Sequence, residues 1–173
     1  MPKSNIVIGW LYPELMNTYG DRGNIIIFKN RCLLRDIEVE VKNITLENDG
    51  SEIESCDFLF MGGAQDKQQA LVYKDFHSKK NSIQKAIDRG IPGVYVCGAY
   101  QLLGEYYMMA DNTKIDGLGI FKLHTENPGT DKPRLIGNII TNTNIEGISD
   151  KNIIGFENHG GRTYLDDKNQ TIK

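Results

Sequence analysis

The sequence predicts an α/β fold with a doubly wound, mostly parallel sheet, flanking helices and an antiparallel extension. Three observations support this fold class. Apolar runs of strand length alternate with stretches of helical periodicity through the first hundred residues. Glycines follow two of these runs directly, where a parallel strand turns towards the next helix. Beyond Gly117 the helical periodicity is absent, and strand-like runs are separated by turns rich in Gly, Pro and Asn.

The first half of the chain should supply the parallel sheet and its helices. Its strands are expected at residues 5–12, 37–41, 56–61 and 94–97. An amphipathic helix is expected at residues 24–36, helical signals continue from Asp66 to Gly90, and a short helix follows Cys97. The apolar positions of the first helix are Ile26, Ile27, Leu33 and Leu34.

The second half of the chain is expected to form the antiparallel extension. Its strands are predicted at residues 119–125, 135–141 and 153–157, with no helix between them. No internal repeat and no linker interrupts the pattern, so we expect residues 1–173 to form a single domain.

Composition excludes several classes of function. With 39% hydrophobic and 25% charged residues and a net charge of -3, the chain shows no sign of a nucleic-acid or anionic-membrane surface. It holds no apolar stretch of membrane-spanning length and no signal peptide, so we expect a cytoplasmic protein without membrane insertion. Three widely spaced cysteines predict neither a disulfide framework nor, without a C-x-x-C pair, a zinc site.

Cys97 is the strongest functional candidate. The apolar run from Ile91 to Val96 ends at this cysteine, and Gly98 follows before a short helix. A strand that turns sharply into a helix aims the thiol at the helix N-terminus, which favours the thiolate, while backbone N–H groups of the turn can hold an oxyanion. A buried structural cysteine is the alternative. We interpret Cys97 as a nucleophile, and the cysteines at positions 32 and 56 as inert.

Two loops are expected at the same sheet edge as Cys97. Gly62 and Gly63 follow a predicted strand, and they form either a plain turn or the second half of an oxyanion hole. Residues 17–24 connect the first strand to the first helix, and Asp21 or Thr18 there also fits a helix cap.

The segment at residues 156–164 is dense in polar side chains and glycine. A surface turn would account for the glycines but not for Asn158, His159 and the neighbouring Glu and Arg together, so we predict a binding role. The other histidines have no such context. His77 is expected on a solvated helix and His124 on a strand face.

Together these segments resemble the class I glutamine amidotransferase superfamily, and within it the cobyric-acid-synthase-like branch. The similarity runs from the first strand to Tyr164, and residues 155–164 favour the glutaminase subunits of lipid II isoglutaminyl synthases over cobalamin-pathway relatives. The motifs that carry it are Tyr19-Gly20-Asp21-Arg22-Gly23-Asn24, Gly62-Gly63-Ala64-Gln65-Asp66 with Gln69-Ala70, Cys97-Gly98-Ala99-Tyr100-Gln101, Asp116-Gly117-Leu118-Gly119, and residues 155–164.

The resemblance implies a flavodoxin-like fold that hydrolyses L-glutamine through a cysteine thioester. The ammonia would pass to an ATP-dependent partner subunit with a Mur-ligase fold, which amidates D-glutamate of lipid II to D-isoglutamine in peptidoglycan synthesis. ATP and Mg²⁺ would bind the partner of this heterodimer, and no cofactor or metal is expected in this chain.

The resemblance also implies roles for individual residues. Cys97 would be the nucleophile, and Gln101 would help to hold glutamine. Arg134 would bind the glutamine carboxylate, as suits a guanidinium. The remaining members of the implied oxyanion and substrate site are Gly62, Gly63, Gly98, Asn158, His159 and Gly160.

The chain departs from the family in two places. The family's catalytic histidine lies in a Leu-His-Gly-Pro-like segment downstream of the Asn-His-Gly-Gly loop, and no such segment occurs in these 173 residues, so we expect a C-terminally truncated form or a degenerate homologue. Ala99 stands where relatives usually have glycine. Three alternatives therefore stay open: a non-catalytic binding or scaffold subunit, a cobyric-acid-synthase-type amidotransferase, and a peptidase-like cysteine hydrolase.

Overall fold

A parallel four-stranded sheet forms the centre of the fold. The computed structural model describes residues 5–143, 146–147 and 150–165; the rest of the predicted domain, including residues 166–173, lies outside the described residues. The sheet has the order β2-β1-β3-β4, with every pair parallel. Its strands are β1 (Asn5–Leu11), β2 (Glu38–Ile44), β3 (Phe58–Met61) and β4 (Gly93–Tyr95).

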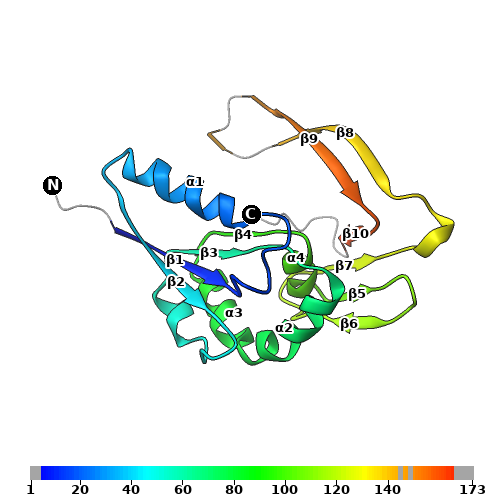
Figure 1. The fold of residues 1–173 in the computed structure, drawn as a ribbon, viewed down its shortest axis with the longest axis horizontal. Coiled ribbons are helices and arrows are strands. Elements are labelled where there is room, and N and C mark those ends of the chain that lie inside the picture. Colours follow the sequence, from blue (N-terminus) through cyan, green and yellow to red (C-terminus); the bar gives the residue numbers. More distant parts are fainter. Residues whose placement is uncertain (1–4, 144–145, 148–149, 166–173) are drawn as a thin grey trace.

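Helices cover both faces of this sheet, as predicted for a doubly wound fold (Figure 1). The helix α1 (Arg22–Leu33) covers one face, where its Ile25 packs with Trp10 and Phe60. The helices α2 (Asp66–Ser78) and α3 (Lys80–Asp88) cover the other. Alternate residues of β1 and β3 enter the two clusters, because successive side chains of a strand point to opposite faces.

Helix α1 packs on a different face from the one its sequence suggested. The residues expected as its apolar positions are exposed, and the buried ones are Ile25 and Cys32. The helix is apolar on two opposite sides, so periodicity alone does not decide which side meets the sheet.

The second half of the chain forms two further sheets. One is four-stranded in the order β10-β7-β5-β6, and the other is the two-stranded antiparallel ribbon β8–β9, which Figure 1 shows extending away from the central sheet. Three strands match the predicted ones with shifted bounds, whereas β5, β6 and β10 were not predicted. The strands are β5 (Tyr106–Met108), β6 (Lys114–Asp116), β7 (Leu123–Glu126), β8 (Leu135–Asn142), β9 (Asn152–His159) and β10 (Arg162–Leu165).

Backbone hydrogen bonds join the second sheet to the first half of the chain. The short helix α4 (Gly98–Leu103) follows β4, and its Leu102 O accepts the N–H of Leu118 at 2.7 Å. Gly104 O accepts the N–H of Gly119 at the same distance. A Cβ at Gly117 would lie 2.1 Å from Gly104 O, so only glycine permits this approach. Two single-turn 3₁₀ helices, Ser51–Ser55 and Gly129–Asp131, complete the described elements.

No helix in the described ranges combines the length and the apolar character that a bilayer span requires.

Candidate active site

Cys97 occupies a sharp turn between β4 and α4, as predicted. Its backbone has φ 51° and ψ -117°, a conformation that L-residues rarely adopt, and its side chain is exposed. The residue before it still pairs with the sheet, since the N–H of Val96 donates to Met61 O at 2.9 Å. A strained strand-to-helix turn that lifts one side chain off the sheet is the geometry of a nucleophile elbow.

Gly63 lies against this elbow, and Gly62 lies against the first loop. A Cβ at Gly63 would lie 3.1 Å from Cys97 Cβ, and one at Gly62 would lie 2.2 Å from Met16 O. The glycines therefore bring the backbone after β3 close to the thiol, which is the placement the sequence predicted.

Asp21 fixes this glycine segment from the first loop. Its Oδ2 accepts the N–H of Gly63 at 3.2 Å and, at 3.4 Å, that of Tyr19. Gly63 O in turn accepts the N–H of Thr18 at 3.1 Å. Asp21 precedes α1 at the N-cap position but makes no side-chain cap bond, so its buried carboxylate serves the glycine segment instead. The sequence suggests Asp21 as a possible helix cap, and its bond to Gly63 depends on a strand end 42 residues away.

Gly98 allows helix α2 to approach the elbow. A Cβ there would lie 2.4 Å from Gln69 Nε2, a buried amide that donates to Ala64 O at 3.0 Å. The side chain of Gln69 thus links the glycine segment to the first turn of α4, a role that the sequence did not assign. Ala99, the next residue of α4, is fully buried.

Gln101 lies one turn beyond Cys97, where α4 meets the segment before β10. A Cβ at Gly161 would lie 3.6 Å from Gln101 Nε2. Next to it, Tyr100 Oη and Thr163 Oγ1 are 3.0 Å apart, so the elbow helix is bonded to β10. The predicted binding loop therefore adjoins the nucleophile helix.

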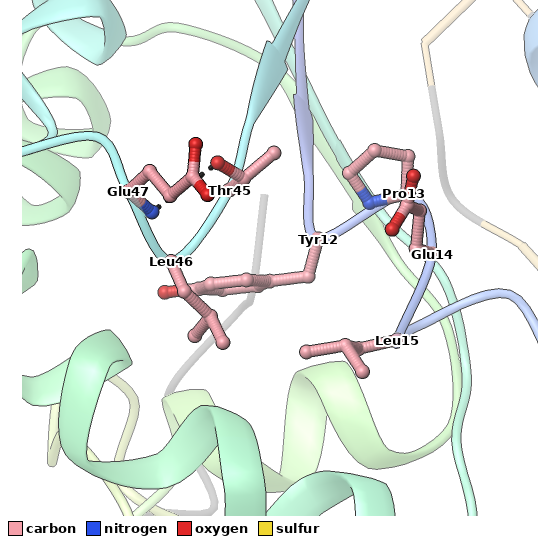
Figure 2. Close-up of a pocket in the computed structure, with 7 residues that line it drawn as sticks. All are labelled: Tyr12, Pro13, Glu14, Leu15, Thr45, Leu46 and Glu47. Carbon is pink, nitrogen blue, oxygen red and sulfur yellow. Dashed lines mark hydrogen bonds between the residues drawn. The ribbon is translucent and has the colours of Figure 1, made fainter.

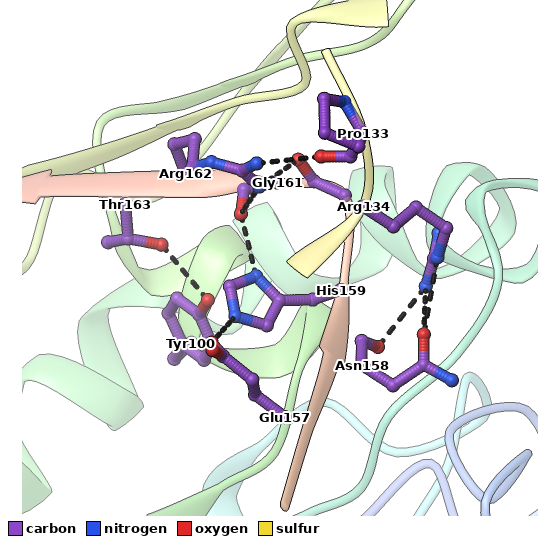
Figure 3. A network of polar contacts seen from close by, with 10 residues as sticks. Tyr100, Pro133, Arg134, Glu157, Asn158, His159, Gly161, Arg162 and Thr163 are labelled. Carbon is purple, nitrogen blue, oxygen red and sulfur yellow. Dashed lines mark hydrogen bonds and ion pairs between the residues drawn. The ribbon is translucent and has the colours of Figure 1, made fainter. Parts of the chain in front are cut away.

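Arg134 and Asn158 form a fork of contacts at the base of the ribbon (Figure 3). The guanidinium donates from Nε and Nη2 to Asn158 Oδ1, both at 3.2 Å, and from Nη2 to Asn158 O at 3.1 Å. A Cβ at Gly160 would lie 3.5 Å from Arg134 Nη1. A hollow of about 400 Å³ adjoins Arg134 and Gly160, with Asn127 and Lys132 also in its wall. Cations and glycine beside an open space suit the binding of a carboxylate.

Both ring nitrogens of His159 face acceptors (Figure 3). Nδ1 lies 2.8 Å from Gly161 O, and Nε2 lies 2.9 Å from Glu157 Oε2. The ring of His159 is therefore held by contacts within its own loop, next to the contacts of Arg134 with Asn158.

The remaining cysteines and histidines lie on the elements predicted for them or next to them, and the inertness of the two cysteines stays a prediction. Cys32 and Cys56 are buried, and burial raises the pKa of the Cys56 thiol. His77 lies on α2 against Tyr73, and His124 lies in β7. Within the described residues no group of three His, Cys, Asp or Glu side chains could hold a metal ion.

A second hollow, of about 350 Å³, opens at the carboxyl ends of β1 and β2 (Figure 2). Tyr12, Leu15 and Leu46 give it an apolar wall, and Glu14 and Glu47 stand at its rim. None of its lining residues is a predicted site residue, and Cys97 lines neither of the two hollows.

Comparison with known proteins agrees with this geometry. The chain is 42% identical over 153 residues to the GatD subunit of lipid II isoglutaminyl synthase (glutamine-hydrolyzing) from Staphylococcus aureus (strain N315), over 88% of this chain and 60% of that protein. It is 39% identical over 166 residues to the same subunit from Streptococcus pneumoniae (strain ATCC BAA-255 / R6), over 95% of this chain and 61% of the relative.

A more distant relative is the cobyric acid synthase of Caldanaerobacter subterraneus, 27% identical over 128 residues, which are 68% of this chain and 25% of that protein. The chain spans about three fifths of the length of its GatD relatives. The model of the CobB/CobQ-like glutamine amidotransferase domain matches residues 7–173, and its match takes in the elbow, the glycine segment and the ribbon base. The chain therefore belongs to the family of CobB/CobQ-like glutamine amidotransferase domains.

Proposed function

We propose that this chain is the glutaminase part of a lipid II isoglutaminyl synthase. The observation that carries the proposal is the strained turn that presents Cys97 next to Gly63. Backbone strain of this kind clusters at active sites, and an exposed thiol there can act as a nucleophile. Its similarity to GatD subunits supports this synthase over a cobyric acid synthase, whose identity is lower.

The reaction begins at the side-chain amide of L-glutamine. The Cys97 sulfur attacks the amide carbon as a thiolate, the C=O bond opens to an oxyanion, and the C–N bond then breaks. The nitrogen leaves as ammonia after taking one proton, and a glutamyl thioester remains on Cys97. Water adds to the thioester, loses a proton, and releases glutamate and the thiol.

Backbone N–H groups beside Cys97 would stabilise the oxyanion. Gly98 supplies one candidate donor at the first position of α4. The N–H of Gly63 already donates to Asp21, so the next one along, that of Ala64, is the better second candidate. Asp21 would then act as a positioning residue that sets the angle of the glycine segment.

The glutamine carboxylate would bind at Arg134. Nε and Nη2 hold Asn158, which leaves Nη1 beside Gly160, where the missing side chain keeps the hollow open. Gln101 would contact the substrate between this arginine and the thiol. The ring of His159 is held against Gly161 O and Glu157 Oε2, so we do not propose it as the donor of the proton on the leaving nitrogen.

The ammonia would serve a partner subunit. We propose an ATP-dependent enzyme of Mur-ligase type that binds ATP and Mg²⁺ and amidates D-glutamate of lipid II. A partner that consumes ATP would need the nucleotide pool of the cytoplasm, so we propose that the heterodimer works there.

Labelling with 6-diazo-5-oxo-L-norleucine, a glutamine analogue that alkylates activated thiols, tests the proposal. Peptide mass spectrometry should find the adduct at Cys97 and not at Cys32 or Cys56, and glutamine should slow its formation. A Cys97→Ser variant is the control. Ammonia release and D-isoglutamine formation with the partner test turnover.

The outcomes separate the alternatives. Labelling without ammonia release, in the presence of the partner, favours a glutamine-binding scaffold. Absence of labelling under the same conditions rejects a glutaminase site. Cleavage of peptides without glutamine hydrolysis favours the peptidase-like alternative, and amidation of a corrinoid favours the cobyric acid synthase.

A further inference from the structure

The outward side of α1 carries a stripe of large apolar side chains. Ile26, Ile27, Leu33 and Leu34 are 51%, 58%, 53% and 83% exposed. Because an α-helix turns once in about 3.6 residues, positions 26, 27, 33 and 34 share one face. That face is opposite Ile25 and Cys32, which are buried against the sheet. A helix with apolar groups on both faces is expected to be covered on both.

Cationic side chains border the stripe. By the same helical geometry, Lys29 lies along one side and Arg31 along the other, and both are exposed. Residues 21–36 contain four Lys or Arg and two Asp, and both aspartates stand at the ends of this segment. Arg22 lies over the Trp10 ring at 5.8 Å, and Arg35 donates to Arg31 O, so those two are engaged at the ends of the helix. The chain-wide charge of -3 conceals this local concentration of positive charge.

We propose that α1 docks this protein on a bilayer surface that contains anionic lipids. The apolar stripe would enter the boundary between headgroups and acyl chains, while Lys29 and Arg31 reach lipid phosphates from its two sides. This is peripheral binding, distinct from a span. It does not depend on the glutaminase chemistry, although a lipid-linked substrate would give it a purpose.

Charge and size favour a lipid surface over a protein partner. Four aliphatic side chains fall well short of the roughly 800 Å² that each partner gives to a stable protein complex. Shallow adsorption needs only a narrow apolar stripe with basic borders. Neither Lys29 nor Arg31 forms an ion pair among the described residues, so both are available to anionic headgroups.

Co-sedimentation with vesicles tests the proposal. The full chain is mixed with vesicles of phosphatidylcholine alone or with phosphatidylglycerol added. Lys29→Gln with Arg31→Gln should weaken binding to the anionic vesicles about 25-fold, at about fivefold for each charge. Ile27→Ser with Leu34→Ser should weaken it at least tenfold, and raised salt should weaken wild-type binding.

Matched controls come from other surfaces of the same chain. Ile140→Ser with Ile154→Ser removes two facing residues of the ribbon that are 69% and 77% exposed. Lys74→Gln with Lys80→Gln removes two exposed charges from α2 and α3. Both controls should bind anionic vesicles within about twofold of wild type, as expected for surface sites remote from the bilayer.

Three results would overturn the docking proposal: no vesicle binding by wild type, equal binding to neutral and anionic vesicles, or unchanged binding of the α1 variants. If wild type fails to bind while Ile27→Ser with Leu34→Ser changes its oligomeric mass or partner binding, the face belongs to a protein contact. Labelling of Cys97 is measured on the same samples, so a wild-type chain that is labelled but does not bind vesicles rejects the docking proposal and leaves the proposed glutaminase function standing.

Discussion

Asp21 Oδ2 accepts the backbone N–H of Gly63 at 3.2 Å and so joins two loops that are 42 residues apart in the chain. Gly63 itself packs on Cys97, since a Cβ at this position would lie 3.1 Å from Cys97 Cβ. The buried carboxylate is therefore one contact away from the nucleophile. Its effect on the reaction would be geometric, because it holds the backbone and not the substrate.

Asp21→Ala should lower both stability and the reactivity of Cys97. Loss of a buried acceptor for a backbone N–H costs about 1–3 kcal/mol of the free energy of unfolding. Urea unfolding measures that cost, and the rate of labelling by the diazo analogue measures the second effect. Asp21→Asn keeps an acceptor oxygen and should lose less of both. Equal loss in the two variants would contradict the hydrogen-bond explanation.

Gly62→Ala should be among the most destabilising changes of one methyl group in this chain. The new Cβ would lie 2.2 Å from Met16 O, a backbone atom that cannot rotate away, so we expect a cost of about 3 kcal/mol or more. Gly23→Ala is the matched control. No atom lies within 4 Å of that Cβ, and alanine in helix α1 should gain about 1 kcal/mol. Comparable unfolding midpoints for the two variants would argue against the close approach.

Arg134→Lys should impair glutamine recognition without changing the intrinsic reactivity of the thiol. The planar guanidinium of Arg134 holds Asn158 with two nitrogens and leaves its third nitrogen for the hollow. Lysine has a single nitrogen and cannot do both. We expect about tenfold more glutamine to be needed to protect Cys97 from the diazo analogue, from loss of a charged hydrogen bond. Alkylation by iodoacetamide, which needs no carboxylate site, should proceed at the wild-type rate. A parallel drop in both rates would show instead that the elbow had been disturbed.

Tyr12→Phe should reduce the loss of stability at alkaline pH. Burial, with a 2.6 Å hydrogen bond to Asp75, raises the pKa of Tyr12 far above its ordinary value. The native state keeps the phenol protonated while the unfolded chain loses the proton near pH 10, so stability is present below that pH and falls above it.

The free energy of unfolding of wild type, relative to that of Tyr12→Phe, should therefore fall by about 1.4 kcal/mol per pH unit above pH 10. Urea unfolding at pH 9 and at two values above 10 gives the slope. Tyr95→Phe is a parallel case, because burial also raises the pKa of Tyr95. A constant difference across this range would mean that Tyr12 ionises equally in both states.

Features that depend on a local sequence pattern were predicted correctly. An apolar run that ends at a cysteine and glycine places the elbow, and the structure has Cys97 there with a positive φ. The parallel sheet followed from apolar runs alternating with helices. The buried face of α1 could not be predicted from the sequence, because Ile25 to Ile27 are all apolar. Only packing on the sheet determines that Ile25 is the buried one.

Long-range contacts explain the other gaps. Asp21 had an ordinary local interpretation as a cap, and only the approach of Gly63 from another strand end gives it a different bond. Strands β5 and β6 have three residues each, too few for alternation to be recognised. They form because they pair with each other and because β5 also pairs with β7. His159 stood out by composition alone, and its function depends on where Glu157 and Gly161 lie.

At position 97, stability and reactivity favour different residues, because the backbone of Cys97 has a positive φ. Such a backbone costs a non-glycine residue on the order of 1–3 kcal/mol, which Cys97→Gly would recover together with the loss of the thiol. Random variants screened only for yield or heat resistance should therefore drift towards glycine at position 97. A screen that also demands ammonia release should retain cysteine, so the two screens would select different residues at position 97.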